Sequence, residues 1–141
     1  MATSTVISCG SLIYCKQTDR YLFLLRAEGR YKNFWGIVGG KVDSKETVID
    51  ALKREIREEL GGEIKDAKYF HIDTYFSKNK EFSYYTFLTT VDEEFIPYLN
   101  KEHKGFCWVA LEDLPNPKHP GLSMTINSEI KRNNLLILQK N

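Results

Sequence analysis

Residue types that bind divalent metals are grouped in one short segment of this sequence. Carboxylate oxygens are the hard ligands that Mg²⁺ and Mn²⁺ prefer in proteins. Two glycine pairs, Gly39-Gly40 and Gly61-Gly62, bracket the segment. Between them an arginine and several acids stand at fixed offsets: Glu46, Arg54, Glu55, Glu58 and Glu59. The grouping indicates a metal site built largely on one helix.

A helical projection tests this idea, because residues of an α-helix are spaced by about 100° around its axis. The apolar residues of the segment share one arc: Val48, Ile49, Ala51, Leu52, Ile56 and Leu60. Glu55, Glu58 and Glu59 overlap that arc, whereas Glu46 projects from the opposite side and Arg54 from its edge. Three carboxylates are therefore predicted to crowd where the helix meets the rest of the fold. Buried like charges are costly, so a cation is expected beside them.

The alternative interpretation is a solvated helix carrying surface ion pairs. Arg54 and Glu58 have the i, i+4 spacing of such a pair, and Lys53 and Glu46 lie on neighbouring turns. Any single acid is more often a solvated residue than a ligand. The joint pattern of acids favours the metal site.

The segment also resembles, position by position, the signature of the Nudix hydrolases. In that signature a glycine, five residues, a glutamate, seven residues and Arg-Glu precede an aliphatic residue, any residue, Glu-Glu, any residue, a glycine and a final aliphatic residue. The matching positions are Gly40, Glu46, Arg54, Glu55, Ile56, Glu58, Glu59 and Gly61. Gly62 stands where the signature has its final aliphatic residue, a departure that touches no acid.

The resemblance implies a role for each matching residue. Glu58 and Glu59 would be the main metal ligands, joined by the backbone carbonyl of Gly39. Glu55 would orient the nucleophilic water or join the metal cluster, and Arg54 would hold Glu55 in place. Two further positions would be structural, at the start of the helix and at its end: Glu46 and Gly61.

In this family a general base or extra ligand often comes from a loop outside the signature. The best candidate is Glu102, in a Glu-His segment before Trp108 that resembles several Nudix subgroups. His103 itself is interpreted as a surface or loop-packing residue. The rival loop acids are Glu93, Glu94 and Glu112.

Substrate contacts would require cations for phosphate and flat side chains for a base. Arg26 ends a predicted strand, and Gly40 allows a ligand to approach the backbone closely. His119 lies in a proline-rich loop stiff enough to place a side chain, although it is equally consistent with a turn residue. Aromatic candidates for stacking, which core packing would explain as well, are Phe34, Tyr75, Tyr85 and Phe87.

Hydrophobic periodicity predicts the elements that position these residues. Strands are expected over 5–14, 21–26, 35–38, 69–77, 81–90 and 106–110, with helices over 47–60 and 125–139. Ser123 or Thr125 would cap the second helix. This order describes an α/β/α sandwich with a mixed central sheet, one catalytic helix and a C-terminal helix, which is also the architecture that the Nudix resemblance implies.

Length and composition fit a small enzyme. A chain of 141 residues is expected to form one domain, residues 1–141, with a real core. The net charge of +1 gives no sign of a nucleic-acid footprint, and no stretch has the length of a membrane span. Three scattered cysteines favour a reduced, cytoplasmic protein over a disulfide framework.

The function expected from these residues is divalent-metal-dependent hydrolysis of a pyrophosphate bond, with Mg²⁺ as cofactor and Mn²⁺ as a substitute. The substrate would be a nucleoside diphosphate linked to another moiety, such as a nucleoside triphosphate, ADP-ribose, a dinucleoside polyphosphate, a nucleotide sugar or a capped RNA end. The protein would act as a monomer or homodimer. The alternative is a Nudix domain that binds nucleotide or RNA without turnover, which would not require a full set of repelling carboxylates.

Overall fold

The computed structural model describes residues 5–140 of this protein, apart from the side chains of residues 129–131, and these residues form one mixed sheet with helices packed on it. The strands are β1 (Val6–Cys15), β2 (Arg20–Arg26), β3 (Trp35–Gly36), β4 (Val38–Lys41), β5 (Lys68–Phe76), β6 (Phe82–Val91) and β7 (His103–Val109). The helices are α1 (Val48–Leu60), α2 (Pro120–Asn127) and α3 (Glu129–Gln139), with a 3₁₀ turn at Leu111–Asp113.

Strand β1 pairs with a single strand along one edge and with two strands along the other. On the first edge its whole length, from Val6 to Cys15, pairs with β6 in parallel. On the divided edge, residues 8–11 pair with β4 and residues 13–15 pair with β2, both antiparallel. The sheet is therefore mixed, in the order β3-β2-β1-β6-β5, and β4 and β2 diverge from a common strand.

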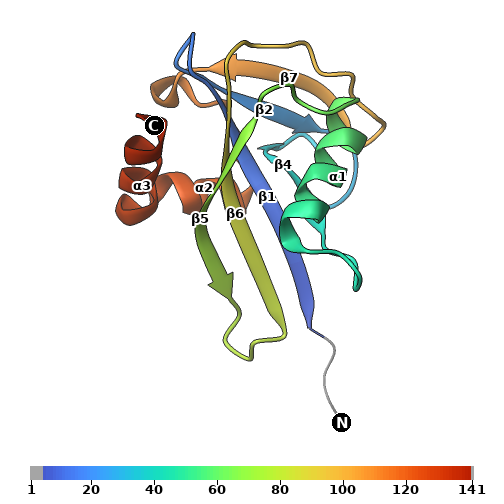
Figure 1. Ribbon diagram of the computed structural model, residues 1–141. Helices are drawn as coiled ribbons and strands as arrows, with labels where there is room; N and C mark the ends of the chain where they lie inside the picture. The colour runs from blue at the N-terminus through green and yellow to red at the C-terminus, as the bar shows by residue number, and fades with distance from the viewer. Residues whose placement is uncertain (1–4, 141) are drawn as a thin grey trace.

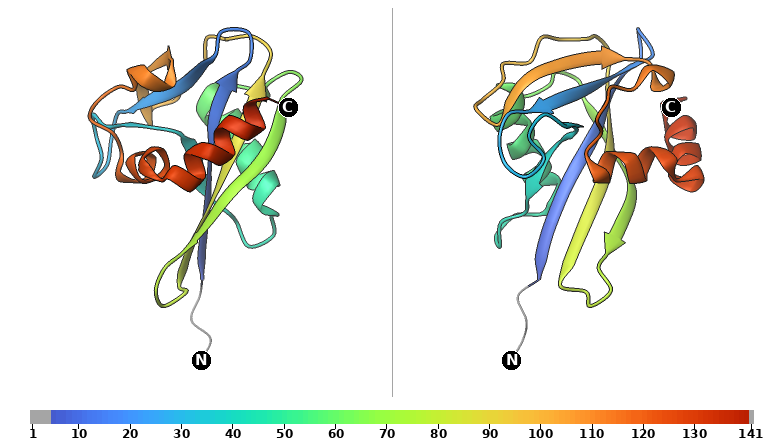
Figure 2. Two further views of the ribbon diagram at one scale, coloured as in Figure 1. Left: turned by 90° about the vertical axis from the view of Figure 1, so that its left-hand side faces the viewer. Right: turned by 180° about the vertical axis from the view of Figure 1, so that it is seen from behind.

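Helices cover both faces of the sheet, as the views in Figures 1 and 2 show. Helix α1 packs on one face in a core cluster that includes Leu52 and Ile56, while α2 and α3 pack on the other in a cluster that includes Leu122 and Leu135. The α/β/α sandwich with a mixed sheet is thus confirmed. The two clusters arise because alternate residues of the strands point to opposite faces.

Helix α1 begins and ends with the capping residues that its sequence favours. The side chain of Thr47 accepts a hydrogen bond from the backbone N–H of Asp50. At the other end Gly61 adopts a left-handed conformation with φ of 85° and donates its N–H to the carbonyl of Arg57. An added Cβ on Gly61 would lie 2.5 Å from that of Tyr98, so this position requires glycine.

Three elements differ from the sequence-based prediction by more than a shift of one residue at an end. The expected strand over 35–38 is divided at Ile37, because β3 pairs with β2 whereas β4 pairs with β1. Strand β7 begins at His103 rather than at residue 106. The expected C-terminal helix is two helices, since Ser128 has an extended conformation between α2 and α3.

The predicted caps of the C-terminal helix, Ser123 and Thr125, are also wrong. Both lie inside α2, and the hydroxyl of Thr125 donates to the carbonyl of Gly121 one turn earlier. The residue that caps α2 is His119, whose ring nitrogen replaces the hydroxyl oxygen usual at this position. The helix can start at Pro120 because proline tolerates the first helical turn.

Cys9 and Cys15 are buried and Cys107 is half-buried, and each carries a free thiol. Within residues 5–140, no helix combines the length and apolar character required to cross a bilayer.

Candidate active site

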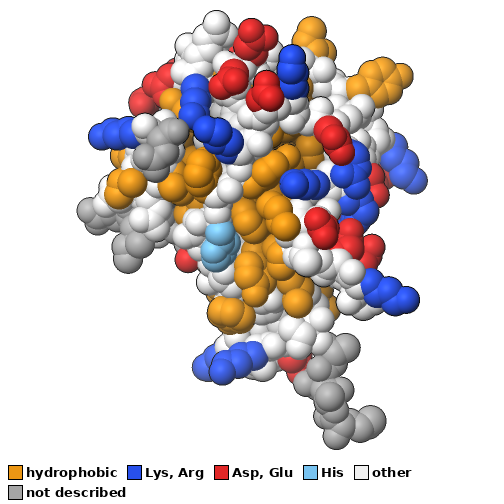
Figure 3. Space-filling view, in the orientation of Figure 1, with side chains coloured by type: hydrophobic (Ala, Val, Ile, Leu, Met, Phe, Trp, Pro, Cys, Tyr) orange, Lys and Arg blue, Asp and Glu red, His pale blue; other side chains and the backbone are white. Residues whose placement is uncertain are grey.

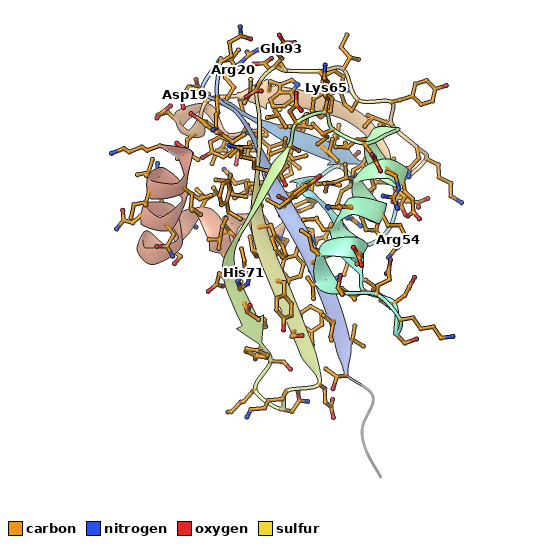
Figure 4. The ribbon with its side chains drawn as sticks, viewed as in Figure 1. Asp19, Arg20, Arg54, Lys65, His71 and Glu93 are labelled. Atoms are coloured by element: carbon orange, nitrogen blue, oxygen red, sulfur yellow. The ribbon has the colours of Figure 1, made fainter. Side chains whose placement is uncertain are left out.

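Arg54 joins the loop before α1 to the acids on the helix. Its Nε and Nη2 donate to the two carboxylate oxygens of Glu46 at 2.8 and 3.0 Å, and Nη1 donates to Glu55 Oε1 at 2.9 Å. Nη2 also donates to the carbonyl of Lys41 at 2.9 Å. The side chain stands on the solvent side of α1 in Figure 4. One guanidinium thus ties the end of β4, the loop and α1 together.

Glu46 stabilises the junction between loop and helix. Besides its paired contact with Arg54, it accepts the backbone N–H of Asp43 at 2.9 Å. The Arg54 guanidinium and this N–H lower the pKa of Glu46 to about 2, and the contact with Glu46 is the main reason that the pKa of Arg54 is raised. The alternative interpretation would pair Lys53 with Glu46, but Glu46 is paired with Arg54 and the Lys53 ammonium lies 5.4 Å from the ring centre of Tyr69.

The Glu55 carboxylate packs directly against the backbone of β4. A Cβ added to Gly40 would lie 2.4 Å from Glu55 Oε1, so a larger residue at Gly40 would displace the carboxylate. The Glu55 side chain is 12% exposed. Burial raises its pKa, and the ion pair with Arg54 opposes that rise. Gly40 is therefore required by the position of Glu55.

Glu59 is the most buried acid of the helix. It is 4% exposed, and its Oε2 accepts the backbone N–H of Gly39 at 2.8 Å. Burial raises the pKa of Glu59 to about 9, with further increases from Glu55 and Glu102, whereas the Gly39 N–H and Arg26 lower it. A cation bound beside Glu59 would offset this cost of burial.

The position of Glu58 contradicts the prediction that the carboxylates of Glu55, Glu58 and Glu59 crowd together. Its side chain is 54% exposed, and both oxygens lie 3.4 Å from Arg54 Nη1. The projection explains the difference, because Glu58 stands at the edge of the apolar arc, only about 40° from Arg54. The i, i+4 contact of the alternative interpretation therefore exists, although it is long. The predicted role of Glu58 as a metal ligand stays a prediction.

Two residues outside the signature meet Glu59 at the start of β7. A carboxylate oxygen of Glu102, one of Glu59 and a ring nitrogen of His103 all lie within 4.8 Å of one another. His103 is 5% exposed, and burial, with a contribution from Arg26, lowers its pKa to about 4. Of the two interpretations of His103, burial contradicts the surface residue and leaves the packing residue open. These three side chains offer a divalent cation two oxygens and one nitrogen.

The rival loop acids lie elsewhere. Glu94 accepts two hydrogen bonds from Arg20, at 2.7 and 2.5 Å. Glu93 lines a separate cavity of about 480 Å³ beyond the C-terminal end of α1, and Figure 4 shows it near Arg20, far from Arg54. Glu112 is exposed in the 3₁₀ turn. Of the four candidates, all within the described residues, Glu102 alone reaches the acids of α1.

A cavity of about 440 Å³ adjoins these acids. The same two glycines that contact Glu55 and Glu59, Gly39 and Gly40, form part of its wall, together with Arg26 and His119. The Nε of Arg26 is buried without a hydrogen-bond partner among the described residues. Gly39 and Gly40 of β4 thus border both the carboxylates of Glu55 and Glu59 and a cavity lined by cationic and polar side chains.

The cap geometry of His119 decides which ring nitrogen carries its proton. The backbone N–H of Gly121 donates to His119 Nδ1 at 3.0 Å, so the neutral ring has its proton on Nε2. Burial and Arg26 lower the pKa of His119. The ring also packs edge-on against Tyr31, with centroids 4.4 Å apart. His119 is therefore both a helix cap and a fixed hydrogen-bond donor at the cavity.

The aromatic wall of this cavity was predicted only in part. Of the four stacking candidates, all of them described, Tyr75 alone lines it, and Phe34 packs with Tyr31. Tyr85 and Phe87 lie on the α1 side of the sheet, where they contact His71. Figure 3 shows hydrophobic side chains gathered beside that histidine. The cavity residues that sequence reasoning missed include Asp73, Phe82, Tyr84 and Met124.

Comparisons with known proteins agree with this geometry. The family model described as the NUDIX domain matches residues 7–126. The chain is 33% identical over 110 residues to an 8-oxo-dGTP diphosphatase of Buchnera aphidicola, covering 77% of this chain and 87% of that protein. It is 31% identical over 117 residues to the nucleoside triphosphatase NudI of Escherichia fergusonii, covering 74% and 77%.

A solved structure is similar as well. The MutT NUDIX hydrolase from Burkholderia pseudomallei has a TM-score of 0.68 and 26% identity, with 89% of this chain and 98% of that chain covered. The domain match spans most of the sequence, including every element that supplies a site residue. The chain therefore belongs to the Nudix hydrolase family.

Proposed function

We propose that this protein hydrolyses a pyrophosphate bond in a nucleoside diphosphate derivative with the help of a divalent cation. The observation that carries the proposal is the position of Gly39 and Gly40. On one side these glycines contact the carboxylates of Glu59 and Glu55, and they also line the cavity that contains Arg26 and His119. A phosphate chain in the cavity would therefore lie beside the acids.

The residues present fit a divalent cation. Glu59 is buried beside other acids and has a raised pKa, which is the environment that a cation relieves. Glu59 and Glu102 would hold it, with Glu55, Glu58 and the carbonyl of Gly39 contributing as the family resemblance implies. Mg²⁺ is the proposed ion and Mn²⁺ its substitute. When bound, the cation supplies charge neutralisation at phosphate and lowers the pKa of a bound water.

Side chains of this protein would orient the attacking water and bind the phosphate groups. Glu55, held by Arg54 Nη1, would orient the attacking water and accept its proton, and Glu102 is the second candidate for that base. Arg26 and the Nε2–H of His119 would donate to phosphate oxygens, because both face the cavity. Together these groups position the substrate and stabilise the developing charge.

Nucleoside triphosphates are the proposed substrate class. Both curated relatives carry names that describe action on nucleoside triphosphates. The cavity also suits the base of such a substrate, since Tyr75, Phe82 and Tyr84 offer aromatic surface. The reaction would release pyrophosphate and a nucleoside monophosphate, or phosphate and a diphosphate, depending on the phosphorus attacked.

A substrate panel tests the proposal. Purified protein is incubated with nucleoside triphosphates, ADP-ribose, dinucleoside polyphosphates and nucleotide sugars, with Mg²⁺ or Mn²⁺. Phosphate, pyrophosphate and nucleoside monophosphate are measured separately, which identifies the bond that breaks. Metal-dependent turnover of a triphosphate supports the proposal. Tight nucleotide binding without turnover of any substrate would overturn it in favour of a non-catalytic Nudix domain.

Glu102→Gln is expected to lower kcat by about 10²-fold, the typical contribution of a general base. Glutamine keeps the size of the side chain but neither binds a proton nor carries charge. The measurement is steady-state kinetics with the best substrate from the panel. Glu93→Gln is the matched control, since Glu93 belongs to the same connection between β6 and β7 but lines the separate cavity. An unchanged kcat in the Glu102 variant would assign the base to Glu55.

Arg54→Lys is expected to lower kcat by about 10- to 100-fold, as loss of a group that orients a catalytic residue does. A single ammonium cannot reproduce the fork that contacts Glu46, Glu55 and the Lys41 carbonyl at once. Arg57→Lys on the same helix is the control, because Arg57 is 47% exposed and its ion pair with Glu63 is 3.6 Å long. Equal kcat values for both variants would show that Glu55 does not depend on Arg54.

A further inference from the structure

His103 is a buried histidine, and one of its two ring nitrogens, Nδ1, has no hydrogen-bond partner among the described residues. The residue is 5% exposed, and its Nδ1 is fully buried without a donor or acceptor among the described residues. Leaving a buried polar atom unpaired costs about 1–3 kcal/mol, and most such atoms in proteins are paired. The environment of this nitrogen therefore requires an explanation.

The position of His103 depends on the pairing of β7 with β2. The register shifts between Leu25 and Arg26, so that Leu25 faces Gly105 while Arg26 faces His103. Lys104 is the extra residue, and such an irregularity redirects the side chains beyond it. The result places a ring nitrogen of His103 within 4.8 Å of carboxylate oxygens from both Glu59 and Glu102. No bond of hydrogen-bond length joins the imidazole to either acid.

We propose that His103 is a nitrogen ligand of the divalent cation, alongside Glu59 and Glu102. The inference rests on the proposed metal site and extends the oxygen ligands that the signature supplies. Imidazole favours transition metals, whereas carboxylates suit Mg²⁺ as well. A histidine in the set therefore shifts the preference of the site away from Mg²⁺ and toward Mn²⁺ and Co²⁺.

The spacing of the three ligand atoms is compatible with one ion. Two ligands bound at about 2.0–2.2 Å lie up to about 4.4 Å apart across the ion. The three ligand atoms lie within 4.8 Å of one another, so small side-chain adjustments would bring them to bonding distance, with the most freedom at the exposed Glu102. Glu59 and His103 are held by packing, so they form the fixed part of the site.

The charges around His103 also favour a cation. Arg26 pairs with His103 between strands β2 and β7, and its positive charge opposes the binding of a cation. Glu59 and Glu102 are the acids beside His103, while the neighbouring Glu55 is paired with the Arg54 guanidinium. Two ionised carboxylates against the one guanidinium of Arg26 would leave a net negative site. Arg26 lines the neighbouring cavity, where a phosphate would neutralise it.

Pulsed electron paramagnetic resonance of the full-length protein with Mn²⁺, without substrate, tests the proposal directly. Wild-type protein labelled with ¹⁵N-histidine is expected to show the nitrogen coupling of a bound imidazole, and His103→Leu is expected to lose it. His71→Gln is the control, because His71 lies on β5 against Tyr85 and Phe87. Absence of histidine coupling in the Mn²⁺-loaded wild type, or its persistence in a folded His103→Leu protein, would overturn the proposal.

A second variant tests the proposal even if the His103→Leu protein does not fold. The chain has three histidines, so the double change of His71 and His119 to Gln leaves His103 as the remaining one. The ¹⁵N coupling is expected to survive in this protein at full strength. Its disappearance there, with Mn²⁺ still bound, would exclude His103 as the source.

Metal titrations by calorimetry measure how far His103 shifts the preference of the site from Mg²⁺ toward Co²⁺. His103→Gln is expected to weaken Co²⁺ binding by about tenfold or more, with a much smaller effect on Mg²⁺. Equal losses for both ions would contradict a nitrogen ligand. These measurements need no turnover, so they can succeed where the substrate panel fails. If no substrate of the panel is hydrolysed, the proposed hydrolysis is overturned. If the histidine coupling is absent, only the assignment of His103 as a metal ligand is overturned.

Discussion

Glu59→Gln is expected to lower kcat by about 10²- to 10³-fold or more, the scale on which loss of a major charge-stabilising contact acts. Glutamine can still accept the Gly39 N–H through its amide oxygen, so the helix should stay in place. It provides no negative charge for a cation. Steady-state kinetics of the best substrate at saturating Mg²⁺ measures the effect, and circular dichroism checks the fold.

Two companion variants make the comparison sharper. Glu58→Gln is also expected to lower kcat by orders of magnitude if Glu58 turns from Arg54 toward the cation, as the signature implies. Glu63→Gln should leave kcat unchanged, because Glu63 is 79% exposed beyond the end of α1. Near-wild-type turnover in both the Glu58 and the Glu59 variants would remove the metal assignment from this helix.

The metal-free protein is expected to lose stability as the pH rises from about 6.5 to about 9. Folded Glu59 has a pKa of about 9, whereas the ordinary value is 4.5. Between these values the folded state binds more protons than the unfolded state, so the free energy of unfolding falls as the pH rises, by roughly 1 kcal/mol per pH unit. Urea denaturation in the presence of a chelator measures the slope.

The lower limit of this pH range is set by His103. Its pKa is lowered from 6.5 to about 4, so below about pH 6.5 it has the opposite effect and destabilises the folded state as the pH falls. Above about pH 6.5 only Glu59, of these two residues, makes the free energy of unfolding depend on pH. Glu59→Gln should therefore abolish the slope, while Glu63→Gln keeps it. A saturating divalent cation should flatten it as well, because the ion binds the charged carboxylate. An unchanged slope in Glu59→Gln would show that Glu59 titrates normally.

Helix α1 was the part of the fold most accessible from the sequence. The apolar arc contains the residues that the structure buries, Ala51, Leu52, Ile56 and Leu60, and Thr47 and Gly61 occupy its two ends. These features depend on neighbours within a few positions, so local spacing was sufficient. The exposure of Glu58 was not predicted, because this residue stands where the apolar arc meets the solvated face.

The C-terminal region shows what local spacing could not predict. Apolar residues continued at helical intervals across Ser128, although the backbone there is extended and divides the helix. The cap was expected to be Ser123 or Thr125, because hydroxyl side chains are common in that role. His119 takes it instead, and no local signal distinguishes a capping histidine from a turn residue.

The sequence by itself determined the family, the layered fold and the chemical character of the helix. A helix fixes angular positions through its 3.6-residue period, so Glu55 and Glu59 could be assigned to one face from spacing alone. Tertiary structure decided which distant residues join them. Arg26, Glu102 and His103 come from β2 and the start of β7, about 30 to 45 positions away from the helix acids, and their approach depends on a shift in strand register. Such long-range pairing leaves no periodic trace in the sequence, because it is set by how the strands and helices pack.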